Sequence, residues 1–387
     1  MGQLCIYLTP FASDYSGACS ALFDLNCMTA INDGGCCTSH YVYYDEPRWT
    51  GEIRPVFSTA IRSIDSILGN DDKIINSICE AAQSMDVEMI AVVGTPVPAL
   101  TGMDLEGIAA EIEYRTGHPC FGFNTTGFHY YDRGIFAAGK ALVDRFAEPM
   151  EVVPGRVNLC GMTPLDLGSC GNDSLLVQQL QAQGYEVGCR FFMGLTTQQV
   201  AACASAERNL AVSAAGLRLA KYLKKRFGTP YTVGIPFAAD GPGTDTRTAA
   251  PSAPDGQTAR TAATAKTLIV ADQVIGCSIR DALAARGADI ENIAVATFFG
   301  FDEALARPGD RYFAEEAEYL QALKEQPYQV LIADPDLFRA PQAQRLTRIP
   351  LVHPAVSGQL GWNNMPRLDA ALPDTLLHQL RTLGIRD

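Results

Sequence analysis

The stretch RNLAVSAAGLRLAKYLKKRFGTPYTVGIPF (208–237) decides the fold of this chain. It begins with a strand-like segment at 208–213, which is apolar over 210–212, continues with an amphipathic segment at 214–228 and ends with an apolar run at 231–237. A strand, a helix of this length and a second strand form the unit from which parallel sheets are built. The stretch therefore predicts a Rossmann-like βαβ unit.

The same alternation continues on both sides of this unit. We therefore predict an α/β protein with three doubly wound Rossmann-like domains and parallel sheets, at 1–153, 154–238 and 263–387. Residues 239–262, which are rich in Gly, Pro, Thr and Ala, are expected to form a flexible linker or lid loop. The first residues, MGQLCIYLTPF (1–11), lack the pattern of a secretion signal and are interpreted as a first strand.

Hydrophobic periodicity places the other elements. Helices are expected at 66–85, 103–117, 172–184 and 273–287, with Asn172 or Asp173 as N-cap of the third. In doubly wound sheets, ligands bind beyond the carboxyl ends of the strands. These ends point to the loops after Val93, Gly161, Ser213, Ile235, Asp272, Asp334 and Val352.

Composition excludes several classes of protein. The chain has 387 residues, of which 47% are hydrophobic, and a net charge of −13. The negative charge argues against a nucleic-acid partner, because phosphate binding needs basic patches. No apolar run is long enough to span a membrane. We expect a cytoplasmic protein.

Two adjacent cysteines, Cys36 and Cys37, follow a turn in INDGGCCTSH (31–40), and Cys19 precedes them in YSGACSALF (15–23). In a reducing compartment, clustered cysteines indicate metal binding or catalysis more often than disulfides. One interpretation is an iron–sulfur site, because thiolates hold such clusters. The other is that these are buried free cysteines acting as small hydrophobic residues.

His353 follows the apolar run IPLV (349–352), at a strand end where ligands bind. An imidazole in this place could ligate a metal or donate a proton, so His353 is the predicted catalytic residue. The alternative is a histidine that only forms a hydrogen bond with a carbonyl group.

Several segments, taken in order, resemble the nitrogenase component 1 superfamily. The cysteine region with YVYYDEPRW (41–49) is similar to the cluster region of that family, and GTPVPALTGMDLEGIAAEIE (94–113) resembles its turn and following helix. The segments at 207–231 and HPAVSG (353–358) resemble its middle domain and a histidine segment of the nitrogenase α-subunit. The resemblance covers nearly the whole chain and implies the three-domain fold.

The chain departs from the family at two places. Thr95 and Pro96 occupy the region where family members carry a third cluster cysteine, and no cysteine lies near 212–214, where nitrogenase anchors its iron–molybdenum cofactor. The resemblance therefore does not extend to reduction of dinitrogen on such a cofactor. Cys19 and Cys37, doubled across a dimer axis, would supply the four thiolates of a [4Fe–4S] cluster, and Cys36 could replace Cys37.

The resemblance implies an oxidoreductase subunit. Its partners would be a second copy or a related subunit, an ATP-dependent iron–sulfur reductase that delivers electrons, and a small-molecule substrate. The alternative is a non-catalytic scaffold or carrier for the assembly of a metal cluster or cofactor. Ser13 and Asp14 are possible oxygen ligands or turn residues, and Asp45, Glu46, Arg48 and Trp49 belong to a docking face or to an ordinary turn.

Overall fold

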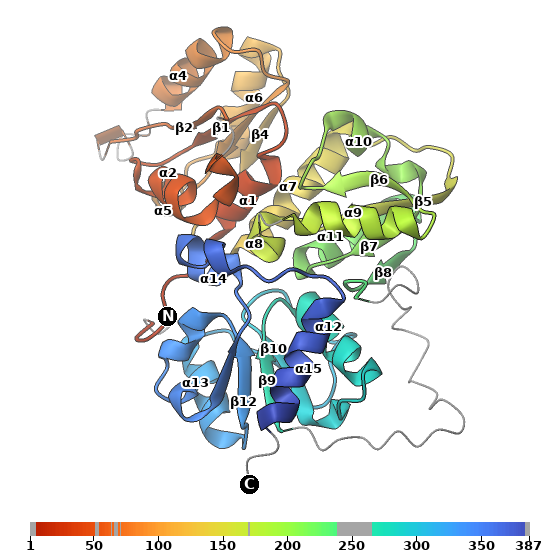
Figure 1. Ribbon diagram of the computed structural model, residues 1–387. Coiled ribbons are helices and arrows are strands. Elements are labelled where there is room, and N and C mark those ends of the chain that lie inside the picture. The colour runs from red at the N-terminus through yellow and green to blue at the C-terminus, as the bar shows by residue number, and fades with distance from the viewer. Residues whose placement is uncertain are drawn as a thin grey trace.

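The computed structural model describes residues 5–50, 54–62, 64, 65, 69, 71–168, 171–237 and 265–383. Figure 1 shows three α/β units, each built around its own sheet. All pairings between the strands of these sheets are parallel. The predicted α/β class with parallel sheets is confirmed. The predicted linker at 239–262 lies outside the described residues.

The first sheet has the strand order β2-β1-β3-β4. Its strands are β1 (Cys27–Ile31), β2 (Val56–Ser58), β3 (Met89–Val93) and β4 (Cys120–Phe123). β1 and β3 are buried along their whole length, as expected for central strands of a sheet covered on both faces. The helices of this part of the chain are α1 (Asp14–Leu22), α2 (Cys36–His40), α4 (Asp71–Gln83), α5 (Pro96–Thr101), α6 (Leu105–Thr116) and α7 (Tyr131–Phe146).

The second sheet contains the stretch that decides the fold, and its order is β6-β5-β7-β8. Its strands are β5 (Val153–Cys160), β6 (Glu186–Phe191), β7 (Ala206–Ala211) and β8 (Tyr231–Val233). The helices are α8 (Pro164–Leu167), α9 (Asn172–Ala182), α10 (Thr197–Ala201) and α11 (Ala214–Phe227). The N-cap of α9 is Gly171, and neither Asn172 nor Asp173. The Asn172 amide instead donates to the carbonyl groups of Leu167 and Pro366.

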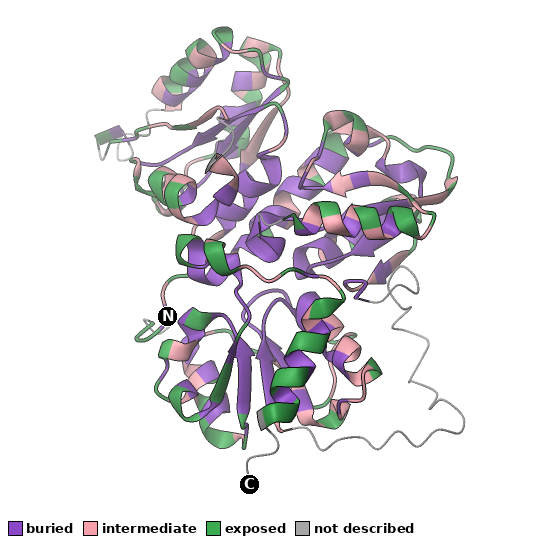
Figure 2. Ribbon diagram, in the orientation of Figure 1, coloured by how far each residue is buried: buried purple, intermediate pink, exposed green. Residues whose placement is uncertain are grey.

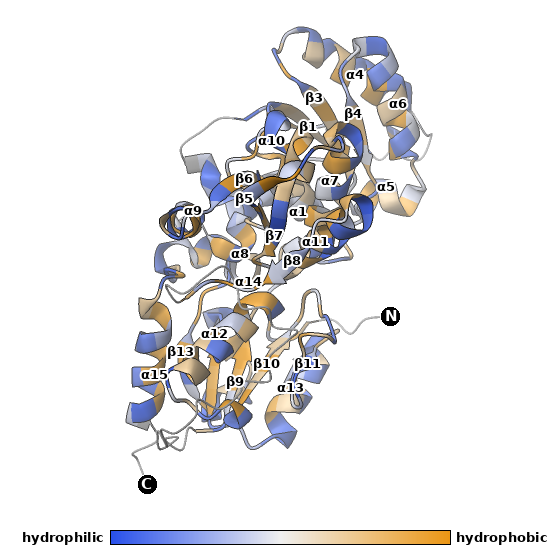
Figure 3. Ribbon diagram, turned by 90° about the vertical axis from the view of Figure 1, so that its right-hand side faces the viewer, coloured by the Kyte–Doolittle hydropathy of each residue, from blue (hydrophilic) through white to orange (hydrophobic). Residues whose placement is uncertain are grey.

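The third sheet has the order β11-β10-β9-β12-β13. Its strands are β9 (Thr267–Val270), β10 (Ile293–Thr297), β11 (Arg311–Tyr312), β12 (Val330–Ala333) and β13 (Thr347–Pro350). The helices are α12 (Gln273–Ala285), α13 (Glu316–Glu325), α14 (Pro354–Ser357) and α15 (Ala371–Leu383). The central strands β1, β3, β9 and β12 are buried along their whole length, and Figures 2 and 3 show buried, hydrophobic residues concentrated on the central strands of the sheets.

The predicted N-terminal strand is wrong for residues 5–11, which form no strand. The backbone N–H groups of Ile6, Tyr7 and Leu8 instead donate to the carboxylate of Glu316 at the start of α13. Of the apolar residues that suggested a strand, Ile6 and Tyr7 are 76% and 39% exposed, whereas Leu8 is buried. One carboxylate that satisfies three backbone donors removes the need for a neighbouring strand.

Two glycines bring α1 and α7 into close contact. A Cβ on Gly17 would lie 2.0 Å from the carbonyl oxygen of Tyr131, and a Cβ on Gly134 would lie 1.7 Å from that of Asp14. No side chain fits at either position, so the backbones of the two helices touch. Since α7 also packs against α11, this helix joins the first two units.

We predict that Gly17→Ala destabilises the protein by about 1–3 kcal/mol, because the new methyl group must push α7 away. The midpoint of thermal unfolding measures the loss. Gly34→Ala is the matched control, since its methyl group would meet only the carbonyl oxygen of Ile61, at 3.5 Å. Equal midpoints for the two variants would show that the helix contact is not tight.

Candidate functional site

Hydrogen bonds to the Asp33 carboxylate fix the turn that carries Cys36 and Cys37. The Asp33 carboxylate accepts hydrogen bonds from the backbone N–H and hydroxyl of Thr38 at 2.9 and 2.8 Å, and from the Ser58 hydroxyl at 2.6 Å. Gly35 precedes α2 with φ +106°, a conformation that favours glycine. The result is a fixed turn in which Cys36 is exposed and Cys37 is half-buried.

Cys37 lies beside two hydroxyl groups. Burial raises the pKa of its thiol, while hydrogen bonds with Tyr15 and Thr95 act in the opposite direction. Thr95 also donates to the backbone carbonyl of Asn32 at 2.7 Å. Thr95 is the residue found in place of a third cysteine, and the structure places it next to Cys37.

Cys19 lies in a different environment. It sits on α1, is 2% exposed and belongs to the hydrophobic core. Burial, followed by the neighbouring Cys27 and Glu46, raises the pKa of its thiol well above the ordinary value. The described residues contain no group of three or more His, Cys, Asp or Glu side chains that could hold a metal ion.

The acidic residues after the cysteine turn are buried. Asp45 accepts from the Ser16 hydroxyl at 2.6 Å, and Glu46 accepts from the Ser20 hydroxyl at 2.8 Å and from Arg48 Nε at 2.8 Å. Asp45 and Glu46 are at most 2% exposed, so the prediction of a docking face or surface turn is wrong for both. They bind the segment after α2 to α1. The sequence held no sign of this, because both serines lie more than 25 residues away.

Asp14 forms hydrogen bonds with backbone N–H groups. Its carboxylate accepts from the N–H groups of Tyr15, Thr126 and Gly127 at 2.7–3.0 Å. These bonds connect the start of α1 to the loop after β4. Of the two interpretations offered by the sequence, the structure supports the turn residue.

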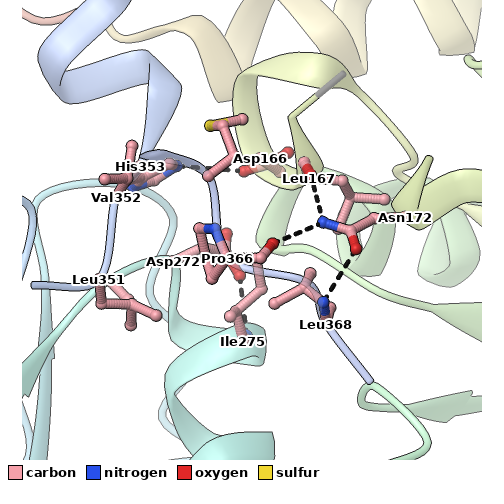
Figure 4. A pocket seen from close by; sticks show the side chains of 12 residues that line it. Asp166, Leu167, Asn172, Asp272, Ile275, Leu351, Val352, His353, Pro366 and Leu368 are labelled. Carbon is pink, nitrogen blue, oxygen red and sulfur yellow. Dashed lines mark hydrogen bonds and ion pairs between the residues drawn. The ribbon is translucent and has the colours of Figure 1, made fainter. Parts of the chain in front are cut away.

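A second site lies where the second and third units meet (Figure 4). It is a cavity of about 20 Å³ beyond the carboxyl ends of β5, β9 and β13, so three of the loops singled out by the sequence contribute to its lining. Its polar lining comes from Asp166, Asp272, His353 and Asn172. The remainder is apolar and consists of Leu167, Ala271, Ile275, Leu351, Val352, Met365, Pro366 and Leu368.

His353 is 5% exposed and belongs to a hydrogen-bonded chain. Its Nε2 lies 3.1 Å from the Tyr131 hydroxyl and 3.6 Å from Asp166 Oδ1. The Tyr131 hydroxyl donates a short hydrogen bond to Asp166, and the Thr163 hydroxyl donates to the other Asp166 oxygen at 3.0 Å. The His353 backbone N–H donates to Asp334 at 2.8 Å. His353 thus takes part in a polar network, and does not only contact a carbonyl group.

Asp272 is the fourth acidic or phenolic group at this place. It caps α12 by accepting from the N–H groups of Val274 and Ile275, and its second oxygen accepts from Ala214 N–H at 2.8 Å. Burial and then the neighbouring Asp166 raise its pKa to about 7. The sequence predicted the loop after Asp272, but Tyr131 and Asp166 come from distant segments and carried no recognisable motif.

The sequence profile of the family described as nitrogenase component 1 type oxidoreductase matches residues 13–246. The chain belongs to this family. The matched range contains the three cysteines as well as Tyr131 and Asp166, whereas Asp272 and His353 lie beyond it.

Curated relatives of this component 1 chain include two proteins named nitrogenase iron-molybdenum cofactor biosynthesis protein NifE. That of Rhodobacter capsulatus is 27% identical over 187 residues, which cover 47% of this chain and 38% of the relative. That of Sinorhizobium fredii (strain NBRC 101917 / NGR234) is 27% identical over 191 residues, covering 47% and 37%. The matched part thus spans less than two-fifths of these relatives.

A solved structure described as "Nitrogenase Cp1 at pH 6.5" shares the fold. Its TM-score is 0.70 at 12% sequence identity, covering 100% of this chain and 94% of that chain. The predicted nitrogenase component 1-like fold is confirmed. In the described part of the chain, no helix is both long and apolar enough to cross a membrane.

We predict that Asp272 makes stability fall as the pH rises. A carboxyl group whose pKa is raised on folding stabilises the folded state below its ordinary pKa of 3.8, and this contribution is lost as the pH passes about 7. One pKa unit corresponds to about 1.4 kcal/mol, so the loss is on the order of a few kcal/mol.

Asp272→Asn should flatten this part of the dependence of unfolding free energy on pH between about 4 and 7, even if the variant is less stable throughout. Denaturant unfolding at several pH values provides the measurement. Asp144→Asn, which alters a half-exposed carboxylate outside the cavity, is the control. A slope in Asp272→Asn equal to that of the unchanged protein would contradict the prediction.

Proposed function

We propose that this chain is the substrate-reducing component of an oxidoreductase. It would take low-potential electrons from an ATP-dependent iron–sulfur reductase through a [4Fe–4S] cluster shared between two subunits, and pass them to a bound substrate or cofactor other than dinitrogen on an iron–molybdenum cofactor. Membership of the component 1 family supports the reaction class. The observation that carries the proposal is the fixed, accessible cysteine turn.

The donor set agrees with a shared cluster. Cys37 is half-buried in a rigid turn, so its thiolate can reach a group at the surface while partly shielded from water. No group of three or more such ligands gathers in the described part of one chain, so we propose that a second copy or a related subunit supplies the remaining thiolates. When bound, such a cluster supplies one-electron transfer.

The second ligand of each chain is Cys19 or Cys36. Cys19 is the ligand implied by the family resemblance, but it lies in the core. Cys36 is exposed on the same turn as Cys37. The protein is expected to act in a reducing, cytoplasmic compartment, where these thiols stay free. His353 and Tyr131 would hold the proton that accompanies an electron.

We predict that Cys37→Ser removes most of the bound iron from protein purified without oxygen. Iron and sulfide content per dimer, together with the EPR spectrum after dithionite, measure the effect. Cys19→Ser and Cys36→Ser then identify the second ligand by the same loss. Cys79→Ser is the control, because Cys79 is half-buried on α4, away from the turn. Full iron content in Cys37→Ser would refute the cluster assignment.

A carrier of metal clusters or cofactors is the second proposal. It is favoured by the relatives named as cofactor biosynthesis proteins. Anaerobic incubation of iron-loaded protein with an iron-free acceptor protein separates the two. A carrier loses its iron to the acceptor, whereas a reductase component retains it through repeated reduction and oxidation.

A further inference from the structure

Around the cavity between the second and third units, acidic side chains outnumber basic ones. Asp166, Asp272 and Asp334 surround a single imidazole, that of His353, and all four residues are at most 6% exposed. No lysine or arginine lines the cavity in the described part of the chain. Buried carboxylates without a positive partner cost several kcal/mol each. The group is therefore expected to retain at least one proton near neutral pH.

The hydrogen bonds around Tyr131 have a direction. The phenol donates to Asp166, so its oxygen is free to accept from His353 Nε2, 3.1 Å away. The bonds thus run from imidazole to phenol to carboxylate. Each link is short enough for a proton to move along it without a change in the backbone.

The size of the cavity matches water and not an organic substrate. A volume of about 20 Å³ holds roughly one water molecule, which needs two to four polar partners. Asp166, Asp272 and His353 all line the cavity and supply these partners. Figure 4 shows Asp166 and Asp272 reaching it from two different units.

We propose that Asp166 and Asp272 store one proton at this junction and that Tyr131 passes it to them from His353. In this step His353 gives its Nε2 proton to the Tyr131 oxygen, and the phenol gives its own proton to the Asp166 carboxylate. His353 starts as an imidazolium and ends as a neutral imidazole, Tyr131 is unchanged, and Asp166 ends as a neutral carboxyl group. The use of this proton in a reduction rests on the proposed function, but the store itself does not.

The charged surroundings agree with proton storage. The pKa of Asp272 is raised to about 7, by burial and then by Asp166, while His353 acts in the opposite direction. Tyr131 faces Asp272 from α7, and Cys277 faces it from α12. The next residue of α7, Asp132, forms an ion pair with Arg218 at 3.0 Å. This arginine therefore neutralises Asp132 and not the acids that line the cavity.

Infrared spectroscopy of the full chain, across a pH titration, tests the store directly. The unchanged protein should show the carbonyl band of a protonated carboxyl group on the acidic side, and the band should disappear with a midpoint of about 7. Asp272→Asn and Asp166→Asn should each remove it. Asp144→Asn, in a half-exposed ion pair, should leave it unchanged.

Nitrogen NMR of labelled histidine tests the transfer. In the unchanged protein, the His353 signal should change together with the infrared band, and His353→Gln identifies that signal. Tyr131→Phe should keep the infrared band but uncouple the His353 shift from it. A missing band in the unchanged protein, or a band retained in both aspartate variants, would overturn the proposal.

Both measurements follow protons only, and they apply whether or not iron is bound. If Asp272→Asn does not fold, the infrared band of the unchanged protein and its loss in Asp166→Asn still test the proton store. If these experiments contradict the proton store, the proposed cysteine ligands are unaffected. If the iron measurements contradict the cysteine ligands, the proposed proton store is unaffected.

Discussion

The contact between α1 and α7 is the constraint on which both sites depend. Gly17 and Gly134 allow the two helix backbones to touch, so neither helix can move without the other. α1 carries Tyr15 to the Cys37 thiol, whereas α7 begins with Tyr131, which extends toward His353. A side chain at either glycine would separate the helices and displace both tyrosines.

The polar groups beneath α1 add a second constraint. Asp45 and Glu46 accept hydrogen bonds from Ser16 and Ser20, and Arg48 compensates the charge of Glu46. A buried ion pair with satisfied hydrogen bonds specifies one arrangement, because each charge left alone would be costly. The segment after the cysteine turn is therefore fixed against α1 in one arrangement. The cavity differs, since no lysine or arginine lines it in the described part of the chain, and we propose that its acids share a proton.

Much of the fold could be predicted from the sequence, because parallel strands buried on both faces are continuous apolar runs. β3 is a clear example. The same rule failed at residues 5–11, where an apolar run is held by Glu316 from more than 300 residues away. For the sites, His353 could be found from its place after a strand, and the cysteines from their adjacency. Tyr131 and Asp166 could not, because only the tertiary fold brings them to His353 across 222 and 187 positions.

The two sites lie on either side of one helix pair, and this arrangement has an electrostatic consequence. Tyr15 contacts Cys37, and Gly17, two residues later on α1, touches the backbone of Tyr131. An electron held near Cys37, as proposed for this chain, would add negative charge to a protein interior of low dielectric constant. Nearby negative charge raises the pKa of an acid, so reduction would strengthen the hold of Asp272 on the stored proton. Release of that proton would then await departure of the electron, and the fold would deliver the two together.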